Sequence, residues 1–400
     1  MEPNEHAVAV VGGGIVGSAI AVHLADLGVR PVLVDAGPPG STASALSFAS
    51  ISAFGKDPVG YYELAAAGMG SWRRWSDRLG GAVGYRRGGE LRWESDQDEG
   101  RMLAERVARA QARGYPVRMI SESQLRQLLP DAEPGPVAAA SHAEADAQVD
   151  VPRVLAASRA ALAQAGARLL TGRRARGRLD DDGIQLEVDR DLLLRPATVV
   201  LAAGAESLAI AAEVGLDVPT VPSPGMLLRT TPVAPLAPGV VYLPGPPGPL
   251  VHLRQLDDRH PREPDRHAVL IGERSQEMVA TNPTQRHARE LLAQAARFFP
   301  ALRTAGIERV TVGWRPMPAD RLPLVGPLPG LPSLYLAVTH SGVTVAPALG
   351  RLVARELTGG PPEPLLEAFR PGRFATRAAT LARDVDAVFE GEPRPSGGRG

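Results

Sequence analysis

Three glycines and one aspartate near the N-terminus have the types and the spacing of a site for a phosphate-linked nucleotide. Gly12, Gly14 and Gly17 follow the apolar run at residues 8–11, and Asp35 closes a second apolar run. In a strand–turn–helix unit the first glycine permits the tight turn, the second lets the backbone approach a pyrophosphate, and the third lets the helix pack on the strand. An acid at the end of the second strand accepts hydrogen bonds from ribose hydroxyls. The pattern therefore predicts a dinucleotide site.

Elements of this nucleotide-binding type recur along the chain. Residues 15–27 are predicted as the helix after the glycines and residues 32–34 as the second strand. Residues 199–204 form another buried strand that ends in small residues, and residues 343–357 are predicted as the last long helix. A Pro- and Gly-rich, β-rich region at residues 222–272 separates them. We therefore expect a cofactor domain assembled from distant segments, unlike the continuous block of a simple nicotinamide dehydrogenase.

The composition excludes several classes of function. The 400 residues are 44% hydrophobic and 22% charged, and acidic and basic side chains balance, so a nucleic acid partner is not expected. The absence of cysteine excludes disulfides, thiolate metal ligands and a cofactor tethered through sulfur. No His/Asp/Glu cluster predicts a metal site. Without a signal peptide or an apolar stretch of membrane-spanning length, we expect a cytoplasmic protein.

Four segments spread over nearly the whole chain carry a family resemblance. They are the glycine fingerprint through Asp35, the small-residue loop at residues 40–52, the strand end VVLAAGAES at residues 199–207, and the paired segments 313–326 and 335–344. Together they resemble the D-amino acid oxidase family of FAD-dependent oxidoreductases, which includes glycine oxidase, sarcosine oxidase and D-amino acid dehydrogenases. Phe48 and Ile51 stand near positions where sarcosine oxidase-like members have arginines, so sarcosine specificity is not implied.

The resemblance implies FAD as a non-covalently held cofactor. The residues that it places on FAD are Gly12, Gly14, Ile15, Val16, Gly17, Asp35, Ala36, Ser41, Ala43, Ser44, Ala203, Gly204, Gly313, Arg315, His340, Ser341, Gly342, Val343 and Thr344. Independently of the family, a helix that begins after Ser341 directs its N-terminal N–H groups and the positive end of its dipole at whatever precedes it. If that is the flavin, these groups stabilise the negative charge of its reduced form.

Three residues are candidates for the reaction itself. By resemblance, Arg315 occupies a position that often holds a substrate carboxylate, to which a guanidinium donates two parallel bonds; an ion pair with Asp320 is the alternative. Lys56 is the only lysine of the chain. Its compact charge and shiftable pKa suit substrate binding or activation of oxygen by the reduced flavin, and an exposed loop lysine is the alternative. For His340 we expect a hydrogen-bonded structural role beside the flavin rather than acid–base chemistry.

The resemblance also implies the fold. It is α/β, with a discontinuous Rossmann-like FAD-binding domain of the glutathione reductase type and a second, antiparallel β-sheet substrate domain. We expect the FAD-binding domain at residues 1–80, 140–220 and 311–380, the substrate domain at 81–139 and 221–310, and a disordered tail at 381–400.

The expected reaction is oxidation of a C–N bond in an amine or amino acid by hydride transfer to flavin N5, which gives an imine. Dioxygen or a separate electron acceptor would reoxidise the flavin, and the oligomeric state stays open. One alternative is oxidation of a secondary amine in a biosynthetic intermediate or a modified nucleoside. Others are a flavin-bearing subunit of a larger dehydrogenase complex and a nicotinamide dehydrogenase.

Overall fold

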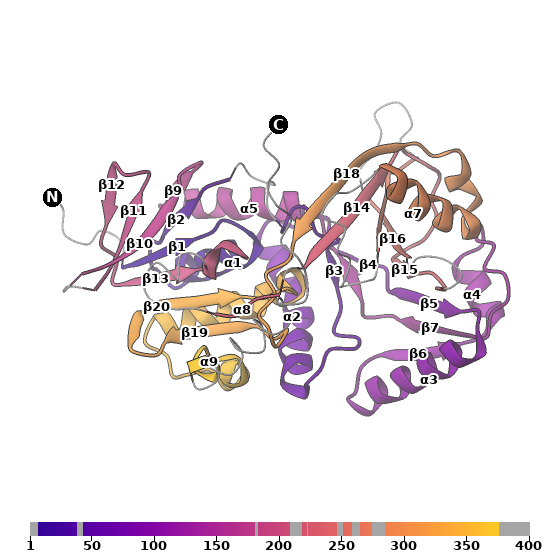
Figure 1. Cartoon of the computed structure of the whole chain (residues 1–400), viewed down its shortest axis with the longest axis horizontal. Coiled ribbons are helices and arrows are strands. Elements are labelled where there is room, and N and C mark those ends of the chain that lie inside the picture. Colours follow the sequence, from indigo (N-terminus) through magenta and orange to yellow (C-terminus); the bar gives the residue numbers. More distant parts are fainter. Residues whose placement is uncertain are drawn as a thin grey trace, which may run out of the picture.

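Two large sheets, at opposite ends of an elongated molecule, organise the protein (Figure 1). The structure is a computed structural model, and it describes residues 7–37, 43–180, 183–208, 218–221, 223–245, 251–257, 265–273 and 285–375. Ser41 and the expected disordered tail at residues 381–400 lie outside these residues.

The smaller of the two sheets has six strands, and they come from the start, the middle and the end of the chain. Their order is β19 (Leu324–Leu328), β20 (Leu331–Val338), β13 (Thr198–Leu201), β1 (Val8–Val11), β2 (Val32–Asp35) and β9 (Arg168–Thr171). All neighbours are parallel except β19 and β20. The predicted assembly of a nucleotide-binding sheet from distant segments is therefore confirmed. The carboxyl ends of β1, β13 and β20 meet at one edge, which is where such sheets bind ligands.

Helix α8 (Gly342–Leu357) packs against both α1 (Ile15–Asp26) and α2 (Val59–Arg78) beside this sheet (Figure 1). Glycines let them approach closely. A Cβ atom on Gly350 of α8 would lie 2.7 Å from the backbone of Ala19, and one on Gly68 of α2 would lie 2.3 Å from the carbonyl oxygen of Thr344. This packing fixes the N-termini of α1 and α8 near each other. Helix α5 (Val151–Gln164) also packs on α1.

The larger sheet has eight strands, antiparallel except for the parallel pair β5 and β15. Their order is β18 (Ile307–Trp314), β14 (Pro224–Thr230), β17 (Val269–Glu273), β16 (Val251–Gln255), β15 (Val240–Tyr242), β5 (Glu90–Glu94), β7 (Ala139–Ala143) and β6 (Val117–Ile120). The expected domain limits at residues 140 and 311 fall inside β7 and β18, and both strands belong wholly to this sheet. A domain division there would have to follow the strand ends instead.

The larger sheet carries helices α3 (Gln97–Ala112), α4 (Glu122–Leu128) and α7 (Gln285–Phe298). Two three-stranded sheets and four short helical turns complete the described part. One sheet consists of β10 (Ala175–Asp180), β11 (Gly183–Val188) and β12 (Leu192–Leu194), and the other of β3 (Ser50–Ile51), β8 (Ala147–Gln148) and β4 (Arg86–Arg87). The helical turns are at residues 206–208, η1 (Pro300–Thr304), η2 (Pro364–Phe369) and α9 (Gly372–Ala375).

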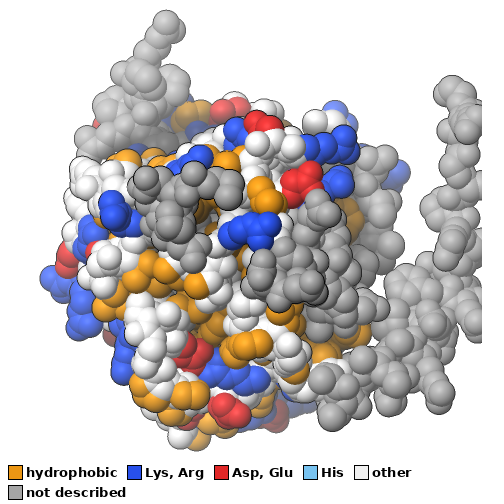
Figure 2. Space-filling model, turned by 90° about the vertical axis from the view of Figure 1, so that its left-hand side faces the viewer, with side chains coloured by type: hydrophobic (Ala, Val, Ile, Leu, Met, Phe, Trp, Pro, Cys, Tyr) orange, Lys and Arg blue, Asp and Glu red, His pale blue; other side chains and the backbone are white. Residues whose placement is uncertain are grey.

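Figure 2 shows one face of the molecule, and on its described part cationic, anionic and hydrophobic side chains are mixed. No described helix combines the length and the apolar character that crossing a membrane requires.

Candidate functional site

One continuous cavity of about 970 Å³ is lined by residues of both large sheets. This volume is at the upper end of the range for small-molecule and cofactor sites, roughly 300–1,000 Å³. At one end the wall consists of the backbone around Gly12 and of Asp35; at the other it includes Lys56, Arg92 and Arg315. We call the first the glycine end and the second the cationic end.

At the glycine end the structure gives a physical reason for two of the three glycines. Gly12 has a φ of +109°, and a Cβ atom there would lie 2.5 Å from the backbone of Ala202. A Cβ atom on Gly17 would lie only 1.9 Å from the carbonyl oxygen of Gly12, so only glycine lets α1 start this close to β1. Gly14 faces the cavity beside Ser44, whose Oγ would be 3.0 Å from an added Cβ.

The Asp35 carboxylate is held in place by two backbone donors. Its Oδ2 accepts from the Gly13 N–H at 2.7 Å and its Oδ1 from the Gly37 N–H at 2.9 Å. Each carboxylate oxygen keeps further capacity to accept a hydrogen bond. The predicted contact with a ribose is compatible with this position on the cavity wall and stays a prediction.

The N-termini of α1 and α8 both open into the cavity. The Ile15 N–H, at the start of α1, donates to Ser44 Oγ at 3.1 Å. The N-cap residue of α8, Ser341, makes no capping bond, and its Oγ accepts instead from Lys56 Nζ at 2.7 Å. The free N–H groups and the positive dipole end of α8 therefore favour negative charge in front of Gly342.

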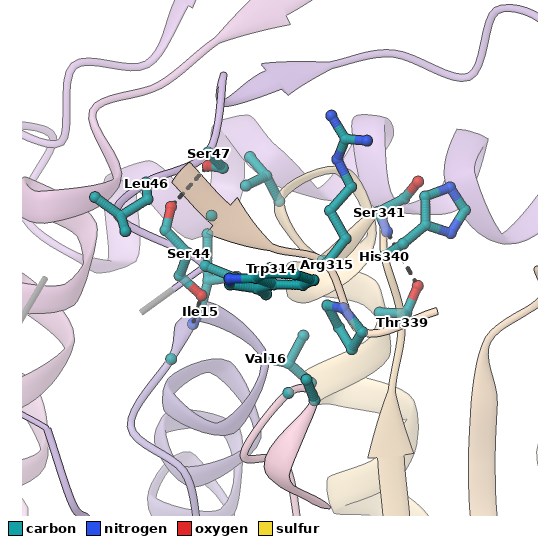
Figure 3. Close-up of a pocket in the computed structure, with 18 of the residues that line it drawn as sticks. Ile15, Val16, Ser44, Leu46, Ser47, Trp314, Arg315, Thr339, His340 and Ser341 are labelled. Carbon is teal, nitrogen blue, oxygen red and sulfur yellow. Dashed lines mark hydrogen bonds between the residues drawn. The ribbon is translucent and has the colours of Figure 1, made fainter. Parts of the chain in front are cut away.

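Lys56, Arg315 and His340 lie together at the cationic end. Figure 3 shows Arg315 and His340 on the same side of the cavity. Burial, followed by the charge of Arg315, lowers the pKa of Lys56 to about 8. Burial, followed by the charges of Lys56 and Arg315, lowers the pKa of His340 to about 3. His340 is thus neutral at physiological pH while both cations keep their charge. The alternative that Lys56 is an exposed loop lysine is wrong.

Arg315 follows the last residue of β18, next to Trp314 in the middle of Figure 3. Its side chain makes only a long contact of 3.5 Å with Ser223 Oγ, and no ion pair of Arg315 occurs within the described residues. The alternative partner Asp320 pairs instead with Arg373 at 2.7 Å, so that alternative is wrong. Burial lowers the pKa of the Arg315 guanidinium, which marks it as a desolvated cation.

His340 contacts Tyr61, whose hydroxyl lies 3.3 Å from its Nδ1. Burial raises the pKa of Tyr61 to about 12, so this phenol stays protonated. Two neutral groups that share a hydrogen bond fit the expected structural role of His340 better than proton transfer near pH 7.

The larger sheet adds a row of residues to the wall that lie outside the predicted catalytic and FAD-binding sets; of these, only His252 was indicated by sequence, as one of two polar residues, with Arg254, that alternate on one strand face. Arg92 and Tyr242 are register partners in the parallel pair of β5 and β15, and Tyr242 is in turn opposite His252 of β16. All three face the cavity, as do Phe48 and Phe54. The available signal was the strand Glu90–Glu94, which has three charged residues in five and is buried throughout.

Nearly all predicted site residues that the structure describes line this one cavity. They are Gly12, Gly14, Ile15, Val16, Asp35, Ala36, Ala43, Ser44, Lys56, Ala203, Gly204, Gly313, Arg315, His340, Ser341, Gly342, Val343 and Thr344. Gly17 lies behind the wall and acts through packing. The described residues contain no group of three or more His, Cys, Asp or Glu side chains that could hold a metal ion.

The cavity fits a flavin dinucleotide on grounds of its own geometry. A wall on which glycine backbone replaces side chains admits a pyrophosphate, and two helix N-termini favour its charge and that of a reduced ring. The cavity volume of about 970 Å³ lies at the upper end of the range for cofactor sites, and its wall extends over both large sheets.

Comparison with known proteins agrees with this geometry. Residues 7–356 match the family model described as FAD dependent oxidoreductase. The chain is 26% identical to an opine oxidase subunit of Agrobacterium tumefaciens (strain Ach5) over 92% of its own length and 98% of the relative's. It is 28% identical to glycine oxidase of Pseudomonas aeruginosa over 89% and 95% of the two chains. The crystal structure of glycine oxidase from Geobacillus kaustophilus shares the fold, with a TM-score of 0.81, 23% identity, and 91% and 98% coverage. The chain therefore belongs to the family of FAD dependent oxidoreductases, and its cofactor is FAD.

Proposed function

We propose that this flavoprotein oxidises the C–N bond of an amine whose α-carbon carries a carboxylate, giving an imine. The observation that carries the proposal is the pair of desolvated cations, Arg315 and Lys56, beside a neutral His340. Bound FAD supplies the acceptor for the hydride that leaves the α-carbon, and the iminium group that remains gives up its N–H proton to water to become the imine.

Arg315 and Lys56 are both partly buried, and no acid of the described ranges pairs with either of them, which is costly unless an anion joins them. The acids that line the cavity do not act as counter-ions for Arg315 and Lys56, because each contacts another group. They are Asp35 on Gly13 and Gly37, Glu90 on Arg92, Glu206 near Arg174, and Glu273 on His287. A substrate carboxylate neutralises one of the two positive charges, and the guanidinium of Arg315 offers it a bidentate fork.

The same cations act on the amine. A positive field from Arg315 and Lys56 disfavours a third positive charge, so it lowers the pKa of a bound ammonium group. The amine then binds in its neutral form, which is the form that can give up its electrons. No carboxylate base next to the cationic end is needed for this, and orientation of the substrate supplies the main catalytic effect.

The curated relatives support the substrate class. Glycine oxidases of Pseudomonas aeruginosa and of Geobacillus kaustophilus, 28% and 26% identical to this chain, are named for the oxidation of an amino acid. A second candidate function comes from the opine oxidase relative, which is named as a subunit and of which the chain matches 98%. In this case the chain would be the flavin-bearing part of a larger enzyme. The cytoplasm is the proposed location.

The test is an anaerobic titration of the purified holoenzyme with glycine, longer amino acids and N-substituted amino acids. A true substrate bleaches the absorbance of oxidised flavin, and NADH should have no comparable effect. Reoxidation by air or only by a dye then separates an oxidase from a dehydrogenase. Failure of every α-amino acid to bleach the flavin would contradict the proposal, and turnover by the isolated chain would contradict its assignment to a larger complex.

A further inference from the structure

Arg92 is a second buried guanidinium in the wall of the same cavity. It is 3% exposed, and its Nη2 donates to Glu90 Oε1 at 3.1 Å. Its Cζ lies 4.2 Å from the centre of the ring of Tyr242, its register partner. The other two nitrogens, Nε and Nη1, have no hydrogen-bond partner among the residues that the structure describes. Both nitrogens are covered by neighbouring atoms, so Arg92 stands in the cavity wall with two donors that the described part of the protein does not satisfy.

The neighbouring acids do not accept hydrogen bonds from the two remaining nitrogens of Arg92. Glu90 supplies one carboxylate oxygen to one nitrogen. Burial and the proximity of Glu90 raise the pKa of Asp146, the next buried acid, well above its usual range, and no hydrogen bond joins this carboxyl group to Arg92 among the described residues. Its Oδ1 is also taken by the hydroxyl of Tyr115. Unmet donors of a buried charged group cost free energy, and protein groups meet such donors in the great majority of cases.

Tyr242 places Arg92 close to the proposed carboxylate site. Its ring contacts the Arg92 guanidinium, and its phenol acts on Arg315 by raising the pKa of that guanidinium against the effect of burial. Two cations are thus adjacent to one tyrosine on the cavity-facing row of β5 and β15. Because both guanidinium groups line the one cavity, a molecule with one carboxylate on Arg315 can extend a second anionic group toward Arg92.

We propose that Arg92 binds a second carboxylate of the substrate, so that the preferred substrates are amino acids with two carboxylates. This inference rests on the proposed function, because Arg315 must hold the first carboxylate. The second carboxylate is carried either by the substituent on the nitrogen or by the side chain on the α-carbon. The chemistry at Arg92 is the same for both.

Binding of unreactive analogues to the holoenzyme tests the proposal without turnover. The analogue pair (methylthio)acetate and thiodiacetate replaces the amine nitrogen by sulfur and differs by one carboxylate. The pair butyrate and glutarate does the same for a carboxylate on the side chain. Dissociation constants come from the change that each ligand causes in the flavin absorbance at pH 7. We expect the second carboxylate to tighten binding by about tenfold or more in one of the two pairs, and that pair identifies where the carboxylate is attached.

The decisive variant removes Arg92 together with its partner. Arg92→Met alone leaves Glu90 buried and unpaired, which can unfold the protein. Glu90→Gln/Arg92→Met removes both charges, and we expect the diacid preference, which is the ratio of the two dissociation constants within an analogue pair, to fall to about one. Glu90→Gln alone removes the negative charge beside Arg92 and leaves a weaker acceptor, so the preference should grow.

Arg254→Met is the matched control. Arg254 is buried to a similar degree, at 6% exposure, lies in the same sheet on β16, and contacts an aromatic ring, that of Phe48. It does not line the cavity. Its loss should leave the diacid preference unchanged.

The outcomes distinguish failure of this inference from failure of the proposed function. Iminodiacetate should bleach the flavin at lower concentration than N-methylglycine if the second carboxylate is on the nitrogen, and glutamate at lower concentration than 2-aminobutyrate if it is on the side chain. If monoacids bind and react but the second carboxylate adds nothing, or if its effect survives in Glu90→Gln/Arg92→Met, the inference is wrong and the function stands. If no amine bleaches the flavin and no analogue binds, both are wrong.

Discussion

At the glycine end of the cavity the protein presents backbone, whereas at the cationic end it presents charged side chains. The glycine end comes from one stretch of chain, Gly12 to Asp35, and its limits are steric: added Cβ atoms would come within 1.9 Å of Gly12 and 2.5 Å of Ala202. The cationic end gathers Lys56, Arg92 and Arg315 from three distant segments, and its limits are electrostatic.

The difference teaches what each end tolerates. A backbone site fails when an atom is added, because nothing nearby can move away. A cluster of cations fails when a charge is lost or masked, because attraction to an anion is all that it supplies. Changes at one end should therefore leave the other working, and the following experiments test that separation, beginning with the largest expected effect.

Gly17→Ala should abolish the glycine end. The new Cβ atom would overlap the carbonyl oxygen of Gly12, so α1 must move away from β1, at a cost of about 3 kcal/mol or more in the free energy of unfolding. We expect colourless protein with a lowered melting temperature, measured by absorbance and thermal unfolding. Gly70→Ala on the exposed side of α2 is the control, since no atom lies within 4 Å of its added Cβ, and it should stabilise the helix by roughly 0.5–1 kcal/mol. A yellow, stable Gly17→Ala protein would refute the steric account.

Arg315→Met should weaken binding of (methylthio)acetate by about 100-fold, since the carboxylate loses its charged fork. FAD content after purification should stay near that of the wild type, because the glycine end is intact. Arg315→Lys should recover only part of the loss, because an ammonium group cannot make the bidentate contact. Equal loss of FAD and of ligand affinity would show that the two ends are not separable.

The cationic end should also respond to pH through Lys56. Its pKa is lowered to about 8, so the group is charged below pH 8 and becomes neutral above it. Affinity for (methylthio)acetate should then fall about fivefold as pH rises from 7 to 10, a change of ~1 kcal/mol, with the midpoint moved upward by the bound anion. His340, with a pKa of about 3, and Tyr61, at about 12, do not titrate in this interval.

Two variants of Lys56 identify the source of that pH dependence. Lys56→Arg keeps its charge throughout, so affinity should stay high and flat. Lys56→Met should be weak and flat. A pH dependence that persists in Lys56→Met would assign the titration to another group.

The smallest effect is expected for Asp320→Asn. This carboxylate pairs with Arg373, and both side chains are partly exposed, so its loss should lower the free energy of unfolding by no more than about 1 kcal/mol. Ligand affinity should not change, because Asp320 is not the partner of Arg315. A marked gain or loss of affinity would restore Asp320 as a neighbour of the site.

The glycine end was predictable from sequence because its contacts are local. The spacing of Gly12, Gly14 and Gly17 predicts a strand–turn–helix unit, and residues 15–27 were predicted where α1 spans Ile15–Asp26. The last long helix was predicted at residues 343–357 and begins one residue earlier, at Gly342. In both cases glycine and an apolar pattern decide the structure within one turn.

The cationic end was predictable only in part. The resemblance indicated Arg315, and the single lysine drew attention to Lys56. Arg92 could not be placed, because its position depends on parallel pairing of β5 with β15, two strands about 150 residues apart whose register no local pattern reveals. Nor does sequence show that Asp320 meets Arg373 rather than Arg315.

The single lysine of the chain has a practical consequence. Besides the α-amino group, Lys56 carries the only primary amine of the protein, and it lines the cavity. Because the pKa of its ammonium group is about 8, a small acylating reagent at mildly alkaline pH meets a large fraction in the reactive neutral form. Mass spectrometry of the intact protein would then count modification at one internal position, and protection by a bound carboxylate would report occupancy of the cavity without any measurement of turnover. Lys56 is thus a single site at which the cavity can be labelled selectively.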